Sequence, residues 1–141
     1  MRPPIEQAFG TGFAGLIGIE LQSLAEDEVR VRFAVRDELK QPAGLVDGGV
    51  YATVAENISS VATWWAHREQ GLMAMGLSNH TSFLRPVTAG HVDAEARARH
   101  RGRTTWVWEV DFLDDLRRLC ALSRVTVAVR DPRGGPPAQP R

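Results

Sequence analysis

Residues 41–56 read QPAGLVDGGVYATVAE and contain the start of the longest helical pattern in the chain. Pro42 and Gly44 break the first part of this segment into a loop. Asp47 then offers a short side-chain acceptor for the free N–H groups of a first helical turn. Beyond it, apolar residues recur every three or four positions and form one stripe of an α-helix. They are Val50, Val54, Ile58, Val61 and Trp65. The spacing predicts a helix that begins after Asp47 and ends near His67.

Segments on both sides of this helix alternate between apolar and polar residues, which is typical of strands with one buried and one wet face. The predicted strands cover residues 17–24, 29–35, 77–84, 91–99, 104–113 and 119–130, after a short helix or turn at residues 5–16. Runs of antiparallel strands around one long helix indicate an α+β fold. We therefore expect an antiparallel five- to six-stranded sheet that curls around one central helix.

The composition is that of one globular domain. The chain has 141 residues, of which 43% are hydrophobic and 24% are charged. We expect a single domain at residues 1–130 and a disordered tail, rich in Pro, Gly and Arg, at residues 131–141. The formal net charge of zero gives no support for nucleic-acid binding, which normally requires a basic excess.

Cysteine and histidine usage gives no sign of a disulfide or of a metal site. The one cysteine, Cys120, cannot form an internal disulfide, which favours a reducing compartment. The four histidines are scattered without the spacing of metal ligands, so we expect no metal. The N-terminal residues lack a signal-peptide pattern, and no apolar run is long enough for a membrane span. These features predict a cytoplasmic protein that binds no membrane.

The helix has a second face, made of small or polar residues around one carboxylate. These residues are Gly49, Ala52, Thr53, Glu56, Ser60 and Thr63. On pattern alone, a solvent-exposed face is the commoner explanation, because surface carboxylates are the rule. The alternative is a face kept narrow so that a substrate or another chain can approach Glu56.

The Gly48-Gly49 pair at the start of the helix favours the second explanation. Glycine lets another molecule approach the backbone closely, and the free N–H groups of a helix start stabilise negative charge. A substrate carbonyl bound there would have a developing oxyanion stabilised. Glu56 follows two turns later, ~12 Å from Gly48 by helical rise, which is too far for one joint site. In a dimer with two such helices antiparallel, Gly48 of one chain could lie near Glu56 of the other.

The same stretch resembles the signature of hotdog-fold thioesterases of the phenylacetate-pathway type. It most resembles the branch that contains the Arthrobacter-type 4-hydroxybenzoyl-CoA thioesterase. That signature has a polar amide, then His-Gly-Gly six residues later, then an Asp or Glu nine residues after the His. Gln41, Asp47 and Glu56 hold these three spacings. The stretches GLSNHTSFLRPV at residues 76–87 and HRGRT at residues 100–104 extend the resemblance, which covers residues 13–129.

The resemblance implies roles for individual residues. Glu56 would be the nucleophile or general base, and the Gly48 N–H the oxyanion donor. Gln41 would position the carbonyl or the attacking water, and Ser60 would support the carboxylate or the leaving thiol. The CoA and substrate contacts would come from Gly49, Phe83, Arg85, Arg101, Gly102, Arg103 and Thr104. On pattern alone, the explanation that the three arginines are solvated charges at strand ends is at least as good as the explanation that they contact CoA.

One departure from the signature concerns the catalytic mechanism. The family usually has His where this chain has Asp47, which can cap the helix equally well. Near Glu56, this second carboxylate would raise one of the two pKa values and would tune the base or weaken oxyanion binding. It also argues against hydratase chemistry on the same fold, which needs a His at the helix.

The resemblance therefore implies hydrolysis of an acyl-CoA, with an aromatic acyl group as one option, to the free acid and CoA. We expect no cofactor beyond the CoA of the substrate. The expected partner is a second copy of the chain, in a homodimer or a dimer of dimers. A non-catalytic acyl-thioester binder and a thioesterase that acts on an acyl carrier protein stay open as alternatives.

Overall fold

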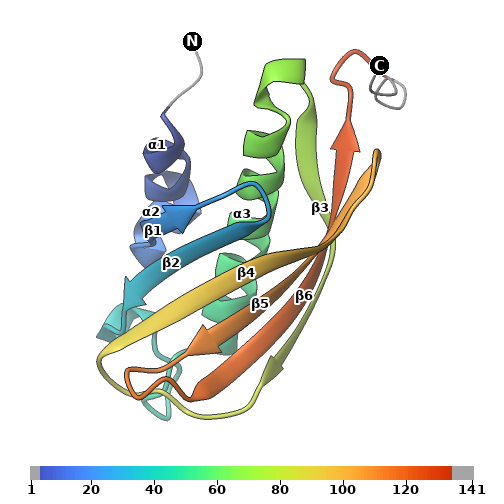
Figure 1. Ribbon diagram of the computed structural model, residues 1–141. Coiled ribbons are helices and arrows are strands. Elements are labelled where there is room, and N and C mark those ends of the chain that lie inside the picture. The colour runs from blue at the N-terminus through green and yellow to red at the C-terminus, as the bar shows by residue number, and fades with distance from the viewer. Residues whose placement is uncertain (1–3, 135–141) are drawn as a thin grey trace.

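The computed structural model describes residues 4–134, which form one long helix and a six-stranded sheet (Figure 1). Two short helices, α1 (Ile5–Gly10) and α2 (Gly12–Ile17), come first and are followed by strands β1 (Glu20–Leu24) and β2 (Glu28–Ala34). The long helix α3 (Gly48–Ala66) comes next. The remaining strands are β3 (Met73–Phe83), β4 (His91–Arg101), β5 (Thr105–Leu113) and β6 (Leu119–Arg130). Single 3₁₀ turns, η1 (Asp37–Leu39) and η2 (Arg68–Gln70), flank α3 in the sequence.

The sheet is antiparallel throughout, with the strand order β1-β2-β4-β5-β6-β3. Its strands cross α3, and β3 runs beside the helix at one edge (Figure 1). The expected hotdog arrangement, a sheet wrapped around one central helix, is confirmed, with six strands. Because β3 is the last strand in this order, one of its edges has no neighbour among the described residues.

Asp47 starts α3 as the sequence predicts. Its backbone is extended, and its side chain accepts a hydrogen bond from the Gly49 N–H at 2.8 Å. This contact satisfies one of the free donors of the first turn. At the other end, the His67 N–H donates to the Trp64 carbonyl, and the His67 ring nitrogen Nδ1 bonds the Thr63 carbonyl at 2.8 Å. The predicted bounds of the helix are therefore confirmed.

The face that α3 buries is broader than the predicted stripe. Tyr51, Ala55 and Ala62 are buried along with Val54 and Ile58. Thr63 was expected on the polar face, but it is fully buried, and this expectation is wrong. Its hydroxyl accepts a hydrogen bond from Trp108 Nε1 at 2.9 Å and donates to the Ser59 carbonyl. A buried indole N–H needs such a partner, which explains a polar residue at this position.

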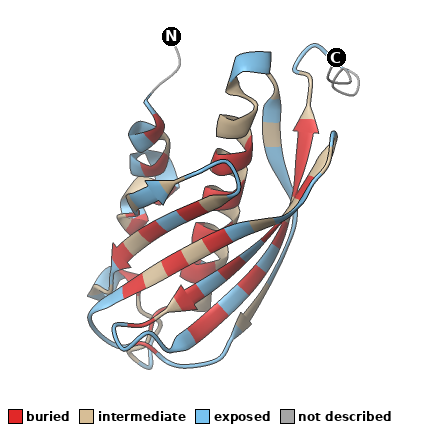
Figure 2. Cartoon of the chain, viewed as in Figure 1, coloured by how far each residue is buried: buried red, intermediate tan, exposed pale blue. Residues whose placement is uncertain are grey.

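The core lies between α3 and the concave face of the sheet. Figure 2 shows buried positions alternating along β2, β4, β5 and β6. The aromatic residues of β5 point inward, with Trp108 and Phe112 fully buried. β3 has no buried residue, and Met75 and Leu77 are exposed on it. The two edge strands, β1 and β3, are thus less covered than the strands between them.

Three predicted boundaries need correction. The segment at residues 5–16 is two helices, because Gly12 has a positive φ of 61° that an α-helix cannot continue. Ile17 ends α2, where Gly18 adopts the left-handed conformation at φ 83°, so β1 begins only at Glu20. β3 begins at Met73 rather than Leu77, because an edge strand without a buried face lacks the alternation that marks the others.

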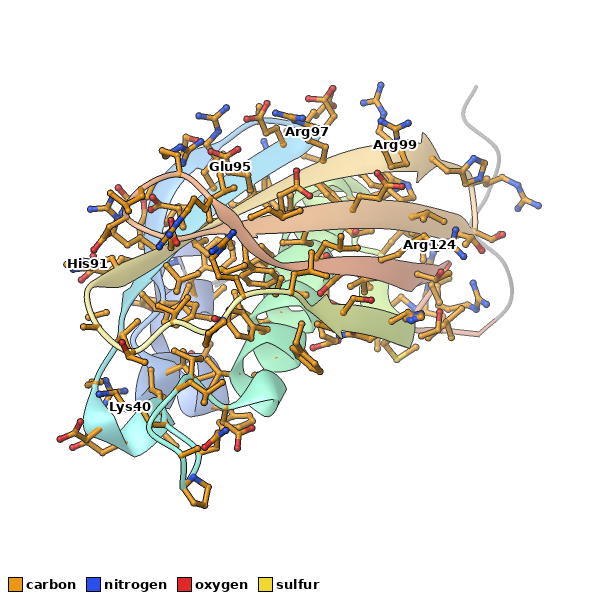
Figure 3. All side chains as sticks on the ribbon, turned by 90° about the horizontal axis from the view of Figure 1, so that it is seen from below. Lys40, His91, Glu95, Arg97, Arg99 and Arg124 are labelled. Atoms are coloured by element: carbon orange, nitrogen blue, oxygen red, sulfur yellow. The ribbon has the colours of Figure 1, made fainter. Side chains whose placement is uncertain are left out.

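The convex face of the sheet carries charges in cross-strand rows. Register places Arg97 opposite Glu109 and Glu109 opposite Arg124. Arg97 and Arg99 extend from β4 away from α3 (Figure 3). Opposite charges on neighbouring strands stabilise the pairing modestly. This face is therefore solvated, in contrast to the face that holds α3.

The predicted tail lies mostly outside the described residues. Residues 131–133 form a turn in which the Arg133 guanidinium bonds the Asp131 carboxylate at 2.7 Å. Residues 135–141 are not described. Among residues 4–134, no helix has the length and apolar character to cross a bilayer.

Candidate active site

The first cluster at the candidate site surrounds Glu56, and we call Glu56, Ser60 and Gly76 the carboxylate group. Glu56 is half-buried on the face of α3 that lies against β3. Ser60, one turn later, donates a hydrogen bond from Oγ to Glu56 Oε1 at 2.8 Å. The carboxylate also lies against Gly76 of β3, where an added Cβ would come 2.6 Å from Oε1. Glu56 is thus held by its own helix on one side and by β3 on the other.

The second cluster lies at the start of α3, and we call Gln41, Asp47, Gly48, Phe83 and Arg85 the helix-start group. Gly48 is the first residue of the helix. Among residues 4–134, its N–H donates no hydrogen bond, so this donor is available to a ligand. The Phe83 ring lies against Gly48, where an added Cβ would come 2.7 Å from the ring. A backbone donor with the positive end of the helix dipole behind it favours bound negative charge.

A pocket of about 390 Å³ brings most of the helix-start group together. Gln41, Gly48, Phe83 and Arg85 line it together with apolar residues. The apolar and aromatic residues that complete the lining are Leu45, Val46, Tyr51, Leu84, Pro86 and Val87. The Gln41 side-chain oxygen Oε1 accepts a hydrogen bond from the Ala43 N–H, which holds the side chain in its own loop. A largely apolar pocket with a few convergent polar groups is typical of a small-molecule site.

Tyr51 lines this pocket and is buried, with 3% of its surface exposed. Its ring packs edge-on against Phe112, with 5.1 Å between centroids. Burial, together with the neighbouring Cys120 thiol, raises the pKa of Tyr51, so the phenol stays protonated. Burial also raises the pKa of Cys120, whose thiol donates to the Phe112 carbonyl at 3.2 Å. These two residues are therefore a neutral part of the core and not a reactive pair.

A shallower hollow of about 320 Å³ lies next to the carboxylate group. Ser60 lines it, as do the apolar residues Ala8, Val61, Trp64 and Ala74. Ser60 also bonds Glu56, so the hollow and the carboxylate group have this residue in common. The lining of the hollow is suited to an apolar group.

The two groups are separate within one chain. Glu56 follows Gly48 by eight residues of helix, or ~12 Å of rise. The Arg101–Thr104 turn is also remote from the pocket. Phe83 pairs with Ala121 on β6, whereas Thr105 pairs with Ala128, seven residues or ~23 Å along the same strand.

The predicted CoA contacts at this turn form their own local structure. Arg101 lies 3.9 Å from Glu26, and the Thr104 carbonyl accepts from the Val129 N–H and from Arg130. Gly102 donates its N–H to the Thr105 carbonyl, and Arg103 lies in the same turn.

Gly49, also predicted to contact the substrate, donates its N–H to Asp47 and lines a further pocket of about 320 Å³ on the α2 side of the helix. The chain therefore brings Gln41, Gly48, Phe83 and Arg85 together, and Glu56 with Ser60, but it does not join these sets.

Two residues at the site had no role in the sequence-based prediction. Gly76 provides the space that the Glu56 carboxylate occupies. Asn79 donates from Nδ2 to the Ala52 carbonyl at 2.8 Å and ties β3 to α3 between the two groups. A glycine inside a strand was a usable signal for the first, because it marks a bulge or a close approach. Asn79 lies in the stretch 76–87 that extends the resemblance, but no pattern in the sequence gave it an individual role.

Comparison with known proteins gives one consistent family. The thioesterase superfamily profile matches residues 43–121. A Listeria monocytogenes protein named 1,4-dihydroxy-2-naphthoyl-CoA hydrolase is 34% identical over 122 residues, which are 86% of this chain and 98% of that protein. An Escherichia coli protein of the same name is 31% identical over 86% of this chain and 90% of its own length.

A solved structure agrees with these sequence relatives. A Haemophilus influenzae thioesterase superposes with a TM-score of 0.84 at 32% identity, over 90% of this chain and 88% of that one. These relatives support the wider superfamily, and they do not single out the 4-hydroxybenzoyl-CoA thioesterase branch that the sequence resembles most. The chain therefore belongs to the thioesterase superfamily of thioester hydrolases.

Proposed function

We propose that the protein hydrolyses an acyl-CoA thioester to the free acid and CoA, with Glu56 as the catalytic carboxylate. The observation that carries this proposal is the Glu56 carboxylate, fixed through Oε1 by Ser60 and lying against β3. Among residues 4–134, Oε2 of Glu56 has no hydrogen-bond partner. A carboxylate with one anchored and one available oxygen is suited to act as a nucleophile or a general base.

Two chemical routes are compatible with this geometry. In one, a Glu56 oxygen attacks the thioester carbon, CoA leaves as the thiolate, and water then cleaves the resulting anhydride. In the other, Glu56 takes a proton from water as the water oxygen attacks the same carbon. In both routes the carbonyl oxygen gains negative charge, which the Gly48 N–H would stabilise. The net reaction consumes one water and gives one acid and one thiol.

The site would be completed by a second copy of the chain. Gly48 and Glu56 are too far apart on one helix, so their joint action requires an antiparallel pair of helices. The unpaired edge of β3 is the surface that supports this arrangement, because an eleven-residue strand offers free N–H and C=O groups to a partner strand. Leu77 is 59% exposed on this strand and would be covered by the partner. A dimer of such dimers is the larger assembly that we expect.

The remaining predicted residues then have places along the substrate. Gln41 at the pocket would orient the carbonyl or the water, and Phe83 would flank the pantetheine arm. Arg85 of one chain, with Arg101 and Arg103 of the other, would meet the CoA phosphates. The apolar hollow with Trp64 would hold the acyl group and is compatible with an aromatic ring. We place the enzyme in the cytoplasm, where CoA thioesters and a reduced Cys120 are both expected.

The experiment measures thiol release from a panel of aryl and aliphatic acyl-CoAs and from matched acyl carrier protein thioesters. Glu56→Gln keeps the shape of the side chain and removes its charge, so it should lower kcat by ~10³-fold or more. Glu56→Ala should do the same. Hydrolysis that survives both substitutions would refute the assignment. Tight CoA binding without turnover of any substrate would instead support a non-catalytic acyl-thioester binder.

A further inference from the structure

The contact between Glu56 and Gly76 is closer than any side chain at position 76 would allow. An added Cβ at Gly76 would lie 2.6 Å from Glu56 Oε1, 3.2 Å from its Cγ and 3.3 Å from its Cδ. Real Cβ atoms essentially never lie within 3.0 Å of a heavy atom outside their own residue and its two chain neighbours, so the carboxylate would have to move. Oε1 is the same oxygen that accepts the Ser60 hydrogen bond. Ser60 and Gly76 therefore define one position for this oxygen.

The backbone at Gly76 does not itself require a glycine. Gly12, Gly18, Gly44, Gly71 and Gly90 have positive φ angles, a conformation that favours glycine, whereas Gly76 does not. An alanine could adopt its backbone conformation, and alanine is also the better strand residue. The three atoms nearest to an added Cβ at position 76 all belong to Glu56, so the main cost of a side chain there is this overlap.

A β-bulge lies directly after this glycine. Gly76 pairs with Val127 and Ser78 with Thr126, so Leu77 is an extra residue in β3. The bulge changes which residues of β3 face α3. Ala74 and Gly76 face the helix before it, and Asn79 and Thr81 face the helix after it. Bulges commonly aim side chains near active sites, and this one separates the space for Glu56 from the Asn79 contact.

We propose that Gly76 is a positioning residue: its missing side chain holds the space in which the Glu56 carboxylate meets Ser60, with Oε2 directed to the substrate. This inference rests on the proposed function of Glu56. The Glu56 side chain is flexible, so an alanine at position 76 would displace the carboxylate without unfolding the strand. A shift of about 1 Å in a reacting group is enough to cost ~10²-fold in rate.

The experiment compares wild type, Gly76→Ala, Glu56→Asp and the double variant Gly76→Ala/Glu56→Asp. Gly76→Ala should lower kcat by ~10-fold or more and change KM by no more than about twofold, with an unchanged melting temperature. Glu56→Asp draws the carboxylate back by one methylene, away from position 76. Its cost in kcat should therefore be smaller in the Gly76→Ala background than in wild type. Ser78→Ala, in the same strand and on its other face, is the control and should keep the wild-type kcat.

A crystal structure of Gly76→Ala provides a readout that does not depend on activity. The Glu56 carboxylate should have left Ser60, whereas in wild type the two are joined. A Glu56 carboxylate that is still bonded to Ser60 in this structure would overturn the role of Gly76. The same holds if the loss of kcat in the double variant equals the product of the losses in the two single variants. If Glu56→Gln abolishes hydrolysis while Gly76→Ala retains the wild-type kcat, the proposed function stands and this inference fails. If Glu56→Gln is fully active, the proposed function itself fails.

Discussion

The helix-start group and the carboxylate group use the same helix in different ways. At the helix start, the central feature is a backbone N–H that Asp47 leaves available by capping Gly49 instead. At the carboxylate group, the central feature is a side chain that Ser60 and Gly76 hold from two sides. The first group lines an apolar pocket, whereas the second lies beside a shallower hollow at an open sheet edge. No carboxylate lines the pocket of the first group, and the second group includes no free N–H of a helix start.

Among the tests of this comparison, the largest effect is expected from removing the donor of the helix-start group. Gly48→Pro deletes the N–H at the first position of α3, where proline is well tolerated. Asp47 already has the extended conformation that a following proline requires, with φ −62° and ψ 135°. We expect kcat to fall ~10²- to 10³-fold, as on loss of an oxyanion-hole donor.

The matched control is Gly48→Ala, which keeps the N–H and brings the same Cβ against Phe83. If the donor matters, the proline variant should be far slower than the alanine variant while both melt at similar temperatures. Equal rates for the two variants would show that the Gly48 N–H has no part in the reaction.

A smaller but more specific effect is expected when two inactive variants are mixed. If each site takes Gly48 from one chain and Glu56 from the other, a heterodimer of Gly48→Pro and Glu56→Gln contains one intact site. After unfolding and refolding together at equal amounts, the mixture should recover about a quarter of wild-type activity. Recovery is measured as thiol release, with each variant refolded alone as the control. No recovery from a confirmed heterodimer would place both residues in one chain's site and contradict the division between the two groups.

The smallest effect is expected from the helix cap. Asp47→Ala removes the acceptor of the Gly49 N–H and should lower the free energy of unfolding by ~1 kcal/mol. Asp47→Asn keeps a capping oxygen and should lower it much less. Chemical denaturation measures both changes, and kcat of the Asn variant reports separately on the carboxylate charge. A stability loss shared equally by both variants would mean that the charge, and not the cap, stabilises the helix start.

Much of the fold could be predicted because the decisive signals are local. The cap at Asp47 and the apolar spacing after it define α3 without reference to the sheet. The alternation in β2, β4, β5 and β6 is equally local, because one face of each strand is buried. β3 lacks a buried face, and its start was therefore missed. Thr63 was misplaced because its partner, Trp108, is 45 residues away.

The candidate site was predictable only in part, for a similar reason. Ser60 lies one helical turn after Glu56, so spacing alone suggests their contact. The Gly76 contact depends on how β3 packs against α3, and the Asn79 contact depends on a bulge that no residue pattern reveals. The pocket that joins Gln41 with Phe83 and Arg85 likewise forms only when distant segments meet.

The bulge in β3 also has a consequence for solubility. A long exposed edge strand with apolar side chains is a template for aggregation during folding and at high concentration. The extra residue Leu77 interrupts the regular ladder near the middle of the strand, so a strand without a matching irregularity can pair with only part of it. The same irregularity that separates the Glu56 contact from the Asn79 contact would therefore limit unwanted association.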